Sequence, residues 1–400
     1  MYNAASGMLL CYVAYGAWPL AMLVIPCCCA YVMTALLGRH AGRVVAIVSL
    51  GYLLKCHVVQ DSLLWRRGDI DNSGTMMLLV LKMITVAYCV SDGIKFKSKK
   101  DAPRNDRLRA IADGQMRRSL HAMPGPIAYF GYLFNCGSCL CGPYHEIGDY
   151  AAWTEARGEW APGSNFYASR RSRWRAAGIA LCKLSACVVL HLIIDAKVKP
   201  HTVNETQTGV LGKVGLAHLV CLSARMRFYF VWILGELGGI LSGLAYTADG
   251  TWSRLRNQDI LGIEFCTSCA MLPIGWNIQV SLWLRHYAYE RYLQHGIGSD
   301  AAVLLTQLVS TIWHGVYPGY LIFFVTSALC IQASKLIHRR TSGLRGTSKS
   351  MLQPFLYLLT QIQNSCAGVR FHVTLAVCVC RRLARHTYLP KTPISHSSFL

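Results

Sequence analysis

The sequence predicts an all-α fold, a polytopic bundle of roughly ten transmembrane helices. Hydrophobic residues make up 53% of the chain and charged residues 15%, whereas soluble domains contain about 25% charged residues. The apolar residues are also clustered, since 9–37 contains no charged residue and 178–194 contains only Lys183. A helix needs about 20 such residues to cross a bilayer core of about 30 Å. The chain is therefore expected to be an integral, multi-pass membrane protein.

Hydropathy places membrane segments along most of the chain. We predict them at 8–37, 43–60, 74–91, 125–141, 176–195, 210–224, 228–247, 260–284, 300–314, 316–338 and 351–380. The first contains Pro19 and Pro26, which predict either one kinked helix or two short passes. The segments 125–141 and 300–314 are short for a span. They are expected to be re-entrant or buried among other helices, where protein or a water-filled cavity satisfies the backbone.

Two hydrophilic insertions interrupt the apolar runs. The segment 95–120 is basic and polar, so it is predicted to be an exposed loop. The segment 142–175 mixes aromatic and charged residues, a pattern typical of an interfacial segment lying on the membrane. We predict one membrane-embedded domain over 1–388 that carries these two basic loops, followed by a disordered tail at 389–400.

The net charge of +21 could indicate a nucleic-acid partner. No recognition module accompanies the charge, so nucleic acid is not an expected partner. In a membrane protein, the simpler interpretation is a charge bias in the loops and attraction to anionic lipid headgroups. Membrane lipids are therefore the expected partners of the basic stretches.

The chain contains 18 cysteines. Most lie within apolar runs, where a thiol behaves as a small hydrophobic group. Cys136, Cys139 and Cys141 resemble half of a zinc site, but no second Cys/His pair has matching spacing. We therefore predict no metal site and no structural disulfide.

His314 is the first candidate for chemistry. The chain lacks soluble catalytic signatures such as a nucleophile elbow, a Walker loop or a dinucleotide fingerprint. Polar residues within apolar segments are costly in a bilayer, so they are functional candidates. His314 lies in such a segment beside Trp313 and Gly315, and an imidazole can act as a general base at neutral pH. The alternative, a buried histidine that only bonds a neighbouring helix, is equally compatible with position alone.

Asn277 is the second candidate, because it lies deepest in an apolar surround. Its spacing with Val280, Ser281 and Leu284 predicts one shared helical face. The amide could orient an imidazole or donate to a developing oxyanion. The alternative is a hydrogen bond that only joins two helices.

Arg225 and Arg227 form the third cluster, ahead of Glu236. Arginine at the start of a span commonly extends its charged end to the interface. The same side chains could instead hold a phosphate through two parallel hydrogen bonds.

Several motifs resemble those of the membrane-bound O-acyltransferases, over about 50–337. They are Trp313-His314-Gly315 with Pro318-Gly319-Tyr320 and Phe324, 276–280 with 283–287, 225–232, Cys141-Gly142-Pro143 with Asp149-Tyr150, and Ser91-Asp92-Gly93. The second and third are most similar to the glycerophospholipid branch, the lysophospholipid acyltransferases. That branch usually has Lys and Tyr where Arg227 and Phe228 stand, and Asp where Ser253 stands.

The resemblance implies a helical bundle enclosing a catalytic tunnel, in which His314 and Asn277 meet. Acyl-CoA would enter from the cytosolic side and a lysophospholipid from the bilayer. His314 would take the proton of the free hydroxyl that attacks the thioester, with no cofactor and no acyl-enzyme. Substrate binding is assigned to motif residues: Arg225, Arg227, Tyr229, Trp232, Glu236, Trp276, Trp283, Trp313, Gly315 and Tyr320. The endoplasmic reticulum is the expected membrane.

Two alternatives differ in class. A multi-pass transporter or channel would explain the spans and the buried polar residues, but not the paired asparagine and Trp-His-Gly motifs. A membrane-bound acyltransferase with a sterol or protein acceptor would keep His314, and is less expected to carry the motif at 225–232.

Overall fold

The computed structural model describes residues 2–63, 72–98, 105–198, 209–315, 318–341 and 353–361. In these ranges the regular structure is helical and no strand occurs, which confirms the all-α prediction. Helical segments long and apolar enough to cross a membrane are Ala17–Val58, Ser73–Lys97, Arg170–Lys197, Val210–Ser242 and Gly319–Thr341. The predicted tail at 389–400 and most of 351–380 lie outside the described residues.

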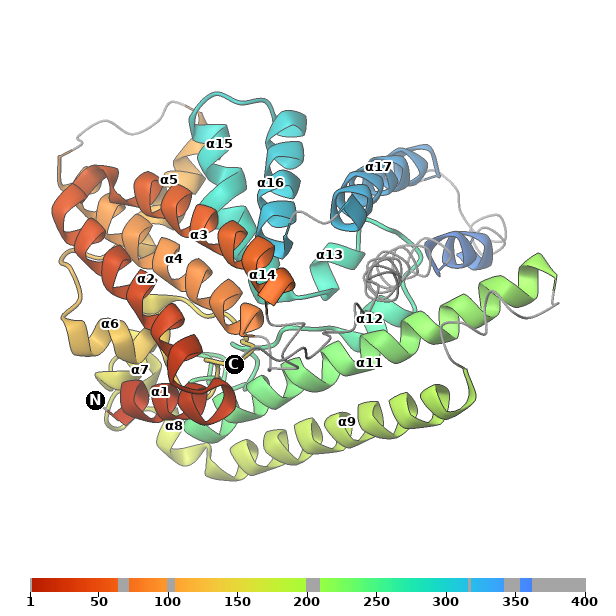
Figure 1. Cartoon of the computed structure of the whole chain (residues 1–400), viewed down its shortest axis with the longest axis horizontal. Helices are drawn as coiled ribbons and strands as arrows, with labels where there is room; N and C mark the ends of the chain where they lie inside the picture. The colour runs from red at the N-terminus through yellow and green to blue at the C-terminus, as the bar shows by residue number, and fades with distance from the viewer. Residues whose placement is uncertain are drawn as a thin grey trace, which may run out of the picture.

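The first four helices are α1 (Tyr2–Tyr15), α2 (Ala17–Leu37), α3 (Ala41–Leu63) and α4 (Ser73–Ser98). Both α2 and α3 pack against α4, and α1 packs against α2 (Figure 1). Gly16, at φ +87°, separates α1 from α2, so the predicted segment at 8–37 is two helices. A side chain at Gly42 would come within 2.4 Å of the Tyr88 ring, which shows how closely α3 approaches α4.

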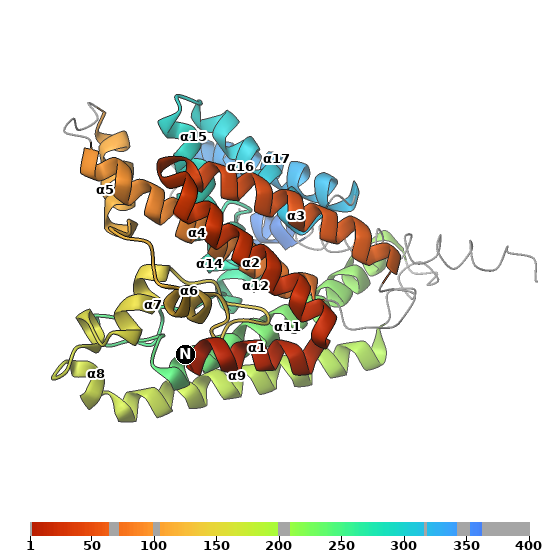
Figure 2. The same ribbon diagram turned by 60° about the vertical axis from the view of Figure 1, so that its left-hand side comes forward.

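The helices α9 (Arg170–Lys197) and α11 (Val210–Ser242) run side by side along one edge of the molecule (Figures 1 and 2). The prediction of two segments at 210–224 and 228–247 is wrong, because α11 is one helix of 33 residues. Arg225 does not interrupt it, since a carboxylate from another segment neutralises its guanidinium. At 1.5 Å per residue α11 is about 50 Å long, more than a bilayer core requires.

The predicted single span at 260–284 is also wrong. This stretch forms three short helices, α12 (Ile260–Glu264), α13 (Leu272–Gly275) and α14 (Ile278–Leu284). The backbone between them bonds to the preceding loop, where Asp259 N donates to Gly275 O and Ile278 N to Asn257 O. Irregular backbone at membrane depth is tolerated where protein satisfies it in this way. Hydropathy alone cannot distinguish three short helices with bonded turns from one helix that spans the membrane.

The predicted loop at 95–120 is largely helical. α4 continues to Ser98, and α5 (Asp106–Arg118) follows, with the Asn105 side chain accepting from Arg107 N at its start. Ile111 on α5 packs with Leu293 and Ala302, so α5 is an amphipathic helix docked on the bundle.

The remaining elements are shorter or close the bundle. They are α6 (Pro126–Leu133), α7 (Ile147–Thr154), η2 (Gly158–Trp160), α8 (Asn165–Ala168), η3 (Arg285–Tyr289), α15 (Glu290–Gln294), α16 (Ser299–His314) and α17 (Pro318–Thr341). Tyr129, Tyr132 and Leu133 of α6 are buried. The predicted segment 125–141 therefore contains a short helix that is buried among other helices, which is one of the two forms predicted for it.

The cysteines of the described residues are all free thiols. We therefore expect a reducing agent to leave the Tm of the detergent-purified protein unchanged. Thermal unfolding with and without dithiothreitol measures this. Loss of a native disulfide typically costs about 2–5 kcal/mol, so a clear fall in Tm on reduction would contradict the prediction.

Candidate active site

Two tryptophans fix the candidate motifs on one face of α4. Trp283 Nε1, at the end of α14, donates to Leu81 O at 3.1 Å. Trp313 Nε1, at the end of α16, donates to Met77 O at 2.9 Å. Since Met77 and Leu81 are one helical turn apart, these carbonyls lie about 6 Å apart along the axis. Both indoles belong to the same buried cluster, so the structure brings the ends of α14 and α16 together.

His314 is the last residue of α16 and lies among aromatic rings. Its ring centroid is 4.6 Å from that of Trp313, and 5.3 Å from those of both Tyr320 and Phe324. Gly315 follows at φ +107°, a conformation that favours glycine, and it turns the chain toward α17. The imidazole makes no hydrogen bond to any helix in the described ranges, so a role as a simple helix-joining residue finds no support there.

His57 is a contact of this site that the sequence did not single out. It is buried on α3, and its Nε2 donates to Trp313 O at 3.1 Å. That carbonyl is in the last turn of α16, where carbonyls lack intrahelical partners. Trp313 is therefore held by its carbonyl from α3 and by its indole from α4, which fixes the adjacent His314. A histidine within the apolar segment 43–60 was the available signal.

We expect His57→Leu to lower kcat by about 10-fold or more, because small displacements of a reacting group are costly. His57→Gln retains an N–H donor and should recover most of the loss. KM should change less than kcat in both variants. Steady-state kinetics on purified protein test this, and equal rates in the Leu and Gln variants would contradict a positioning role.

Asn277 does not share a helical face with Val280, Ser281 and Leu284, as the spacing had predicted. It precedes α14 in the left-handed region, at φ 46° and ψ 54°. Asparagine tolerates this conformation better than most residues. The observed role is therefore that of a fixed turn residue at the start of a short helix.

A buried asparagine, Asn257, holds Asn277 in place. Asn257 Nδ2 donates to Asn277 Oδ1 at 3.0 Å, and its Oδ1 accepts from Gln279 N at 3.0 Å. Asn257 N donates to Glu236 Oε1 on α11. Asn277 Nδ2 makes no hydrogen bond with the part of the chain that the structure describes, so it is available to a substrate. No sequence pattern points to Asn257, which lies 20 residues before Asn277 and has no distinctive spacing with it.

Arg225 and Arg227, the two arginines predicted to bind a phosphate, lie in different surroundings. Arg225 is buried and donates to both oxygens of Glu264, at 2.8 and 2.7 Å. Tyr229 donates to the same carboxylate at 2.8 Å. Arg227 is exposed, because residues two apart on a helix face different sides. The geometry therefore gives Arg225 a structural ion pair and does not bring Arg227 beside it.

An aromatic cluster joins α11 to the Asn277 turn. Trp276, which precedes Asn277, has its ring centroid 4.9 Å from that of Trp232 and 5.7 Å from that of Tyr229. The motif at 225–232 and the asparagine motif thus form one packed unit.

Comparison with known proteins agrees with this arrangement. The model of MBOAT, the membrane-bound O-acyltransferase family, matches residues 63–368. The chain belongs to the membrane-bound O-acyltransferase family. It is 36% identical to lysophospholipid acyltransferase 2 of Arabidopsis thaliana, covering 94% of this chain and 82% of that protein. It is 34% identical to lysophospholipid acyltransferase 1 of the same plant, covering 94% and 83%.

A more distant relative is lysophospholipid acyltransferase 6 of Drosophila melanogaster, at 26% identity over 88% of this chain and 49% of that protein. Family membership and the long apolar helices make this chain an integral membrane acyltransferase. A transporter or channel does not account for that match.

Buried ion pairs connect further motifs of the acyltransferase. Arg291 donates to both oxygens of Asp92, at 2.8 and 2.5 Å, and its guanidinium lies 4.4 Å from the Tyr88 ring centre. Arg254 donates to Asp149 Oδ1 at 2.6 Å, and its guanidinium lies over the Trp160 ring. These pairs fix α4 to α15, and the 142–175 segment to the loop that carries Asn257.

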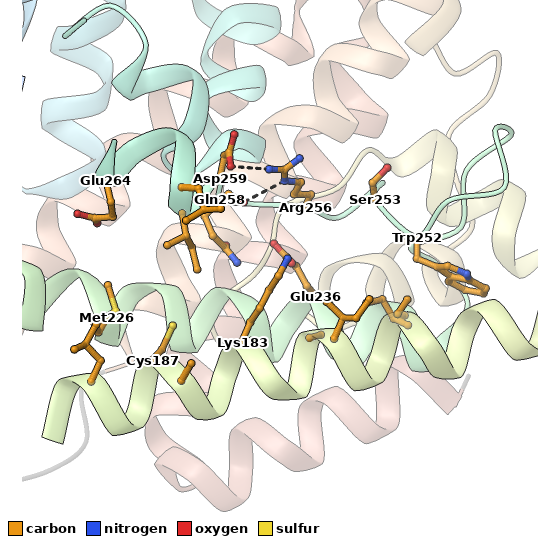
Figure 3. A pocket seen from close by; sticks show the side chains of 18 of the residues that line it. Lys183, Cys187, Met226, Glu236, Trp252, Ser253, Arg256, Gln258, Asp259 and Glu264 are labelled. Carbon is orange, nitrogen blue, oxygen red and sulfur yellow. Dashed lines mark hydrogen bonds and ion pairs between the residues drawn. The ribbon is translucent and has the colours of Figure 1, made fainter. Parts of the chain in front are cut away.

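The acyltransferase has a cavity of about 1130 Å³ between α9, α11 and the segment 251–265 (Figure 3). We call it the α9–α11 groove. Its walls are largely apolar, and Lys183, Glu236 and Ser253 are among its polar lining residues. Glu236 joins the groove wall to Asn277 through Asn257. The groove wall is therefore joined to the Asn277 turn by hydrogen bonds, although neither Asn277 nor His314 lines the groove.

Proposed function

We propose that this acyltransferase transfers a fatty acyl group from acyl-CoA to the free hydroxyl of a lysophospholipid. The observation that carries the proposal is that α14, which follows Asn277, and α16, which ends at His314, are both bonded to α4 through Trp283 and Trp313. The relatives at 34% and 36% identity, named lysophospholipid acyltransferases, support the choice of acceptor.

In the proposed reaction, His314 accepts the proton of the lysolipid hydroxyl as its oxygen attacks the thioester carbonyl. Asn277 Nδ2 donates to the oxygen on which negative charge develops, or orients the hydroxyl. The C–S bond then breaks, and the CoA thiolate takes the proton from His314. Two substrates and two side chains complete the reaction, without a metal, another cofactor or an acyl-enzyme. The aromatic rings around His314 are proposed to keep water away from the thioester.

Trp313, Gly315 and Tyr320 are proposed to shape the chamber around His314. Trp232, Tyr229 and Trp276 are proposed to do the same around Asn277, and Trp283 fixes α14. This unit belongs to one membrane-embedded domain, proposed to cover 1–388. We place the enzyme in the endoplasmic reticulum, which imaging of a tagged chain beside a marker of that membrane tests.

An acceptor panel tests the function. Purified enzyme is given radiolabelled oleoyl-CoA with lysophosphatidylcholine, lysophosphatidylethanolamine, cholesterol or a serine-containing peptide. We expect label in the phospholipid products. Label in sterol ester or peptide, with none in phospholipid, would overturn the assignment.

A further inference from the structure

We propose that the α9–α11 groove is the acceptor subsite and selects a zwitterionic lysophospholipid. Lys183 binds the phosphate, and Glu236 binds the cationic end of the headgroup. This inference rests on the proposed function, because it names the part of the enzyme that recognises the acceptor.

Lys183 is the only charged residue within the apolar run 178–194 of α9. Its side chain is exposed and lines the groove. It forms neither an ion pair nor a hydrogen bond within the described ranges, in contrast to Arg225, which Glu264 neutralises. A cation at membrane depth is costly without a partner, and such residues mark substrate sites. A lipid phosphate in the groove would supply that partner.

Glu236 lies across the groove on α11, and the two side chains point toward one another (Figure 3). They do not form an ion pair, and the proposal places the headgroup between them. Glu236 Oε1 accepts from Asn257 N, and Asn257 in turn holds Asn277. The carboxylate is therefore fixed, and a headgroup bound to it is coupled to the candidate catalytic asparagine.

The charged residues that line the groove favour a ligand with a single phosphate over a ligand with several phosphates. Arg256 pairs with Asp259 at 2.9 Å, and Glu264 pairs with Arg225 at 2.7 Å. Lys183, Arg175 and Glu236 are the charged lining residues outside these pairs, a balance that suits a zwitterionic headgroup better than the multiply charged CoA moiety.

The walls of the groove suit a single acyl chain that comes from the bilayer. Leu222 and Met226 of α11 and Cys187 of α9 supply apolar lining. Ile179 and Leu190, also lining residues, are 48% and 38% exposed, so the groove is open along the side of α9. A membrane-resident lysophospholipid can enter there, with its chain along the wall and its headgroup at Lys183.

Lys183→Gln tests the phosphate contact in purified enzyme. A charge-assisted hydrogen bond contributes enough that its loss should raise KM for lysophosphatidylcholine by about 10-fold or more. KM for oleoyl-CoA should change by less than about two-fold. Lys183→Arg retains a cation and should recover most of the affinity. The matched control is Lys197→Gln, which removes an exposed lysine of the same helix outside the groove.

Glu236→Gln tests the headgroup contact, because glutamine keeps an oxygen for Asn257 N–H and loses only the charge. We expect the preference for lysophosphatidylcholine over lysophosphatidic acid, which lacks a headgroup cation, to fall by about 10-fold. An unchanged preference would overturn the role of Glu236. A higher KM for oleoyl-CoA in Lys183→Gln, with no change for the lysolipid, would assign the groove to the donor instead.

The wild-type enzyme separates this inference from the proposed function. If it acylates no lysophospholipid at all, the proposed function fails. If it acylates lysophosphatidylcholine and Lys183→Gln leaves both KM values unchanged, only the groove assignment fails.

Discussion

A His314→Ala variant is expected to lose about 10²- to 10⁴-fold of the acyl-transfer rate, the usual contribution of a general base. In the wild type, His314 is the last residue of α16. Its imidazole lies among Trp313, Tyr320 and Phe324 and makes no hydrogen bond within the described residues. Removing it should therefore abolish proton transfer while expression and Tm stay close to those of the wild type. Initial rates with oleoyl-CoA and lysophosphatidylcholine, on detergent-purified protein, measure the loss.

His338→Ala is the matched control, because that histidine is exposed at the end of α17. Its rate should equal that of the wild type. If His314→Ala retained more than about a tenth of the wild-type rate, the role of His314 as the base would be lost.

Asn277→Gly is expected to lose about 10²-fold or more of the rate, as removal of an oxyanion donor typically does. Glycine adopts the left-handed conformation of residue 277 freely, so the backbone is kept and only the amide is removed. Asn277→Ala should lose at least as much, since alanine also strains the turn. Combining Asn277→Gly with His314→Ala should cost little more than His314→Ala alone, because residues that act together are non-additive.

A wild-type rate in Asn277→Gly would show that the amide takes no part in the reaction. If instead the loss in the double variant were the product of the two single losses, the residues would act independently. Either result would exclude the paired mechanism.

Features that depend on the local sequence pattern could be predicted from the sequence alone. Long apolar runs with few or no charged residues predicted α2, α3, α4, α9 and α17, because a helix that crosses a bilayer needs about 20 apolar residues. The order of the short motifs indicated the family, which the family match confirms.

Features that depend on distant contacts could not be predicted. Hydropathy divided α11 at Arg225, because the neutralising carboxylate of Glu264 lies 39 residues further along the chain. Hydropathy also made 260–284 one span, because the bonds from Asn257 that hold the turn at Asn277 have no sequence signature.

The candidate site shows the same division. The motifs supplied His314 and Asn277, whereas His57 and Asn257 act through backbone and amide contacts that only the fold reveals. Arg225 and Arg227 were the expected cations for a phosphate, yet one is paired and the other faces away. The sequence shows Lys183 as the single charged residue in an apolar run, but the proposed role in binding a headgroup depends on Glu236, which also lines the groove.

The most direct test of the account follows both products of a single reaction. Purified wild-type enzyme and His314→Ala receive radiolabelled oleoyl-CoA and lysophosphatidylcholine, and free CoA thiol is measured beside labelled phosphatidylcholine. The account predicts that the wild type releases one thiol for each labelled phospholipid, and that the variant forms neither product above background. Thiol release without labelled phospholipid, or undiminished labelling by the variant, would contradict it.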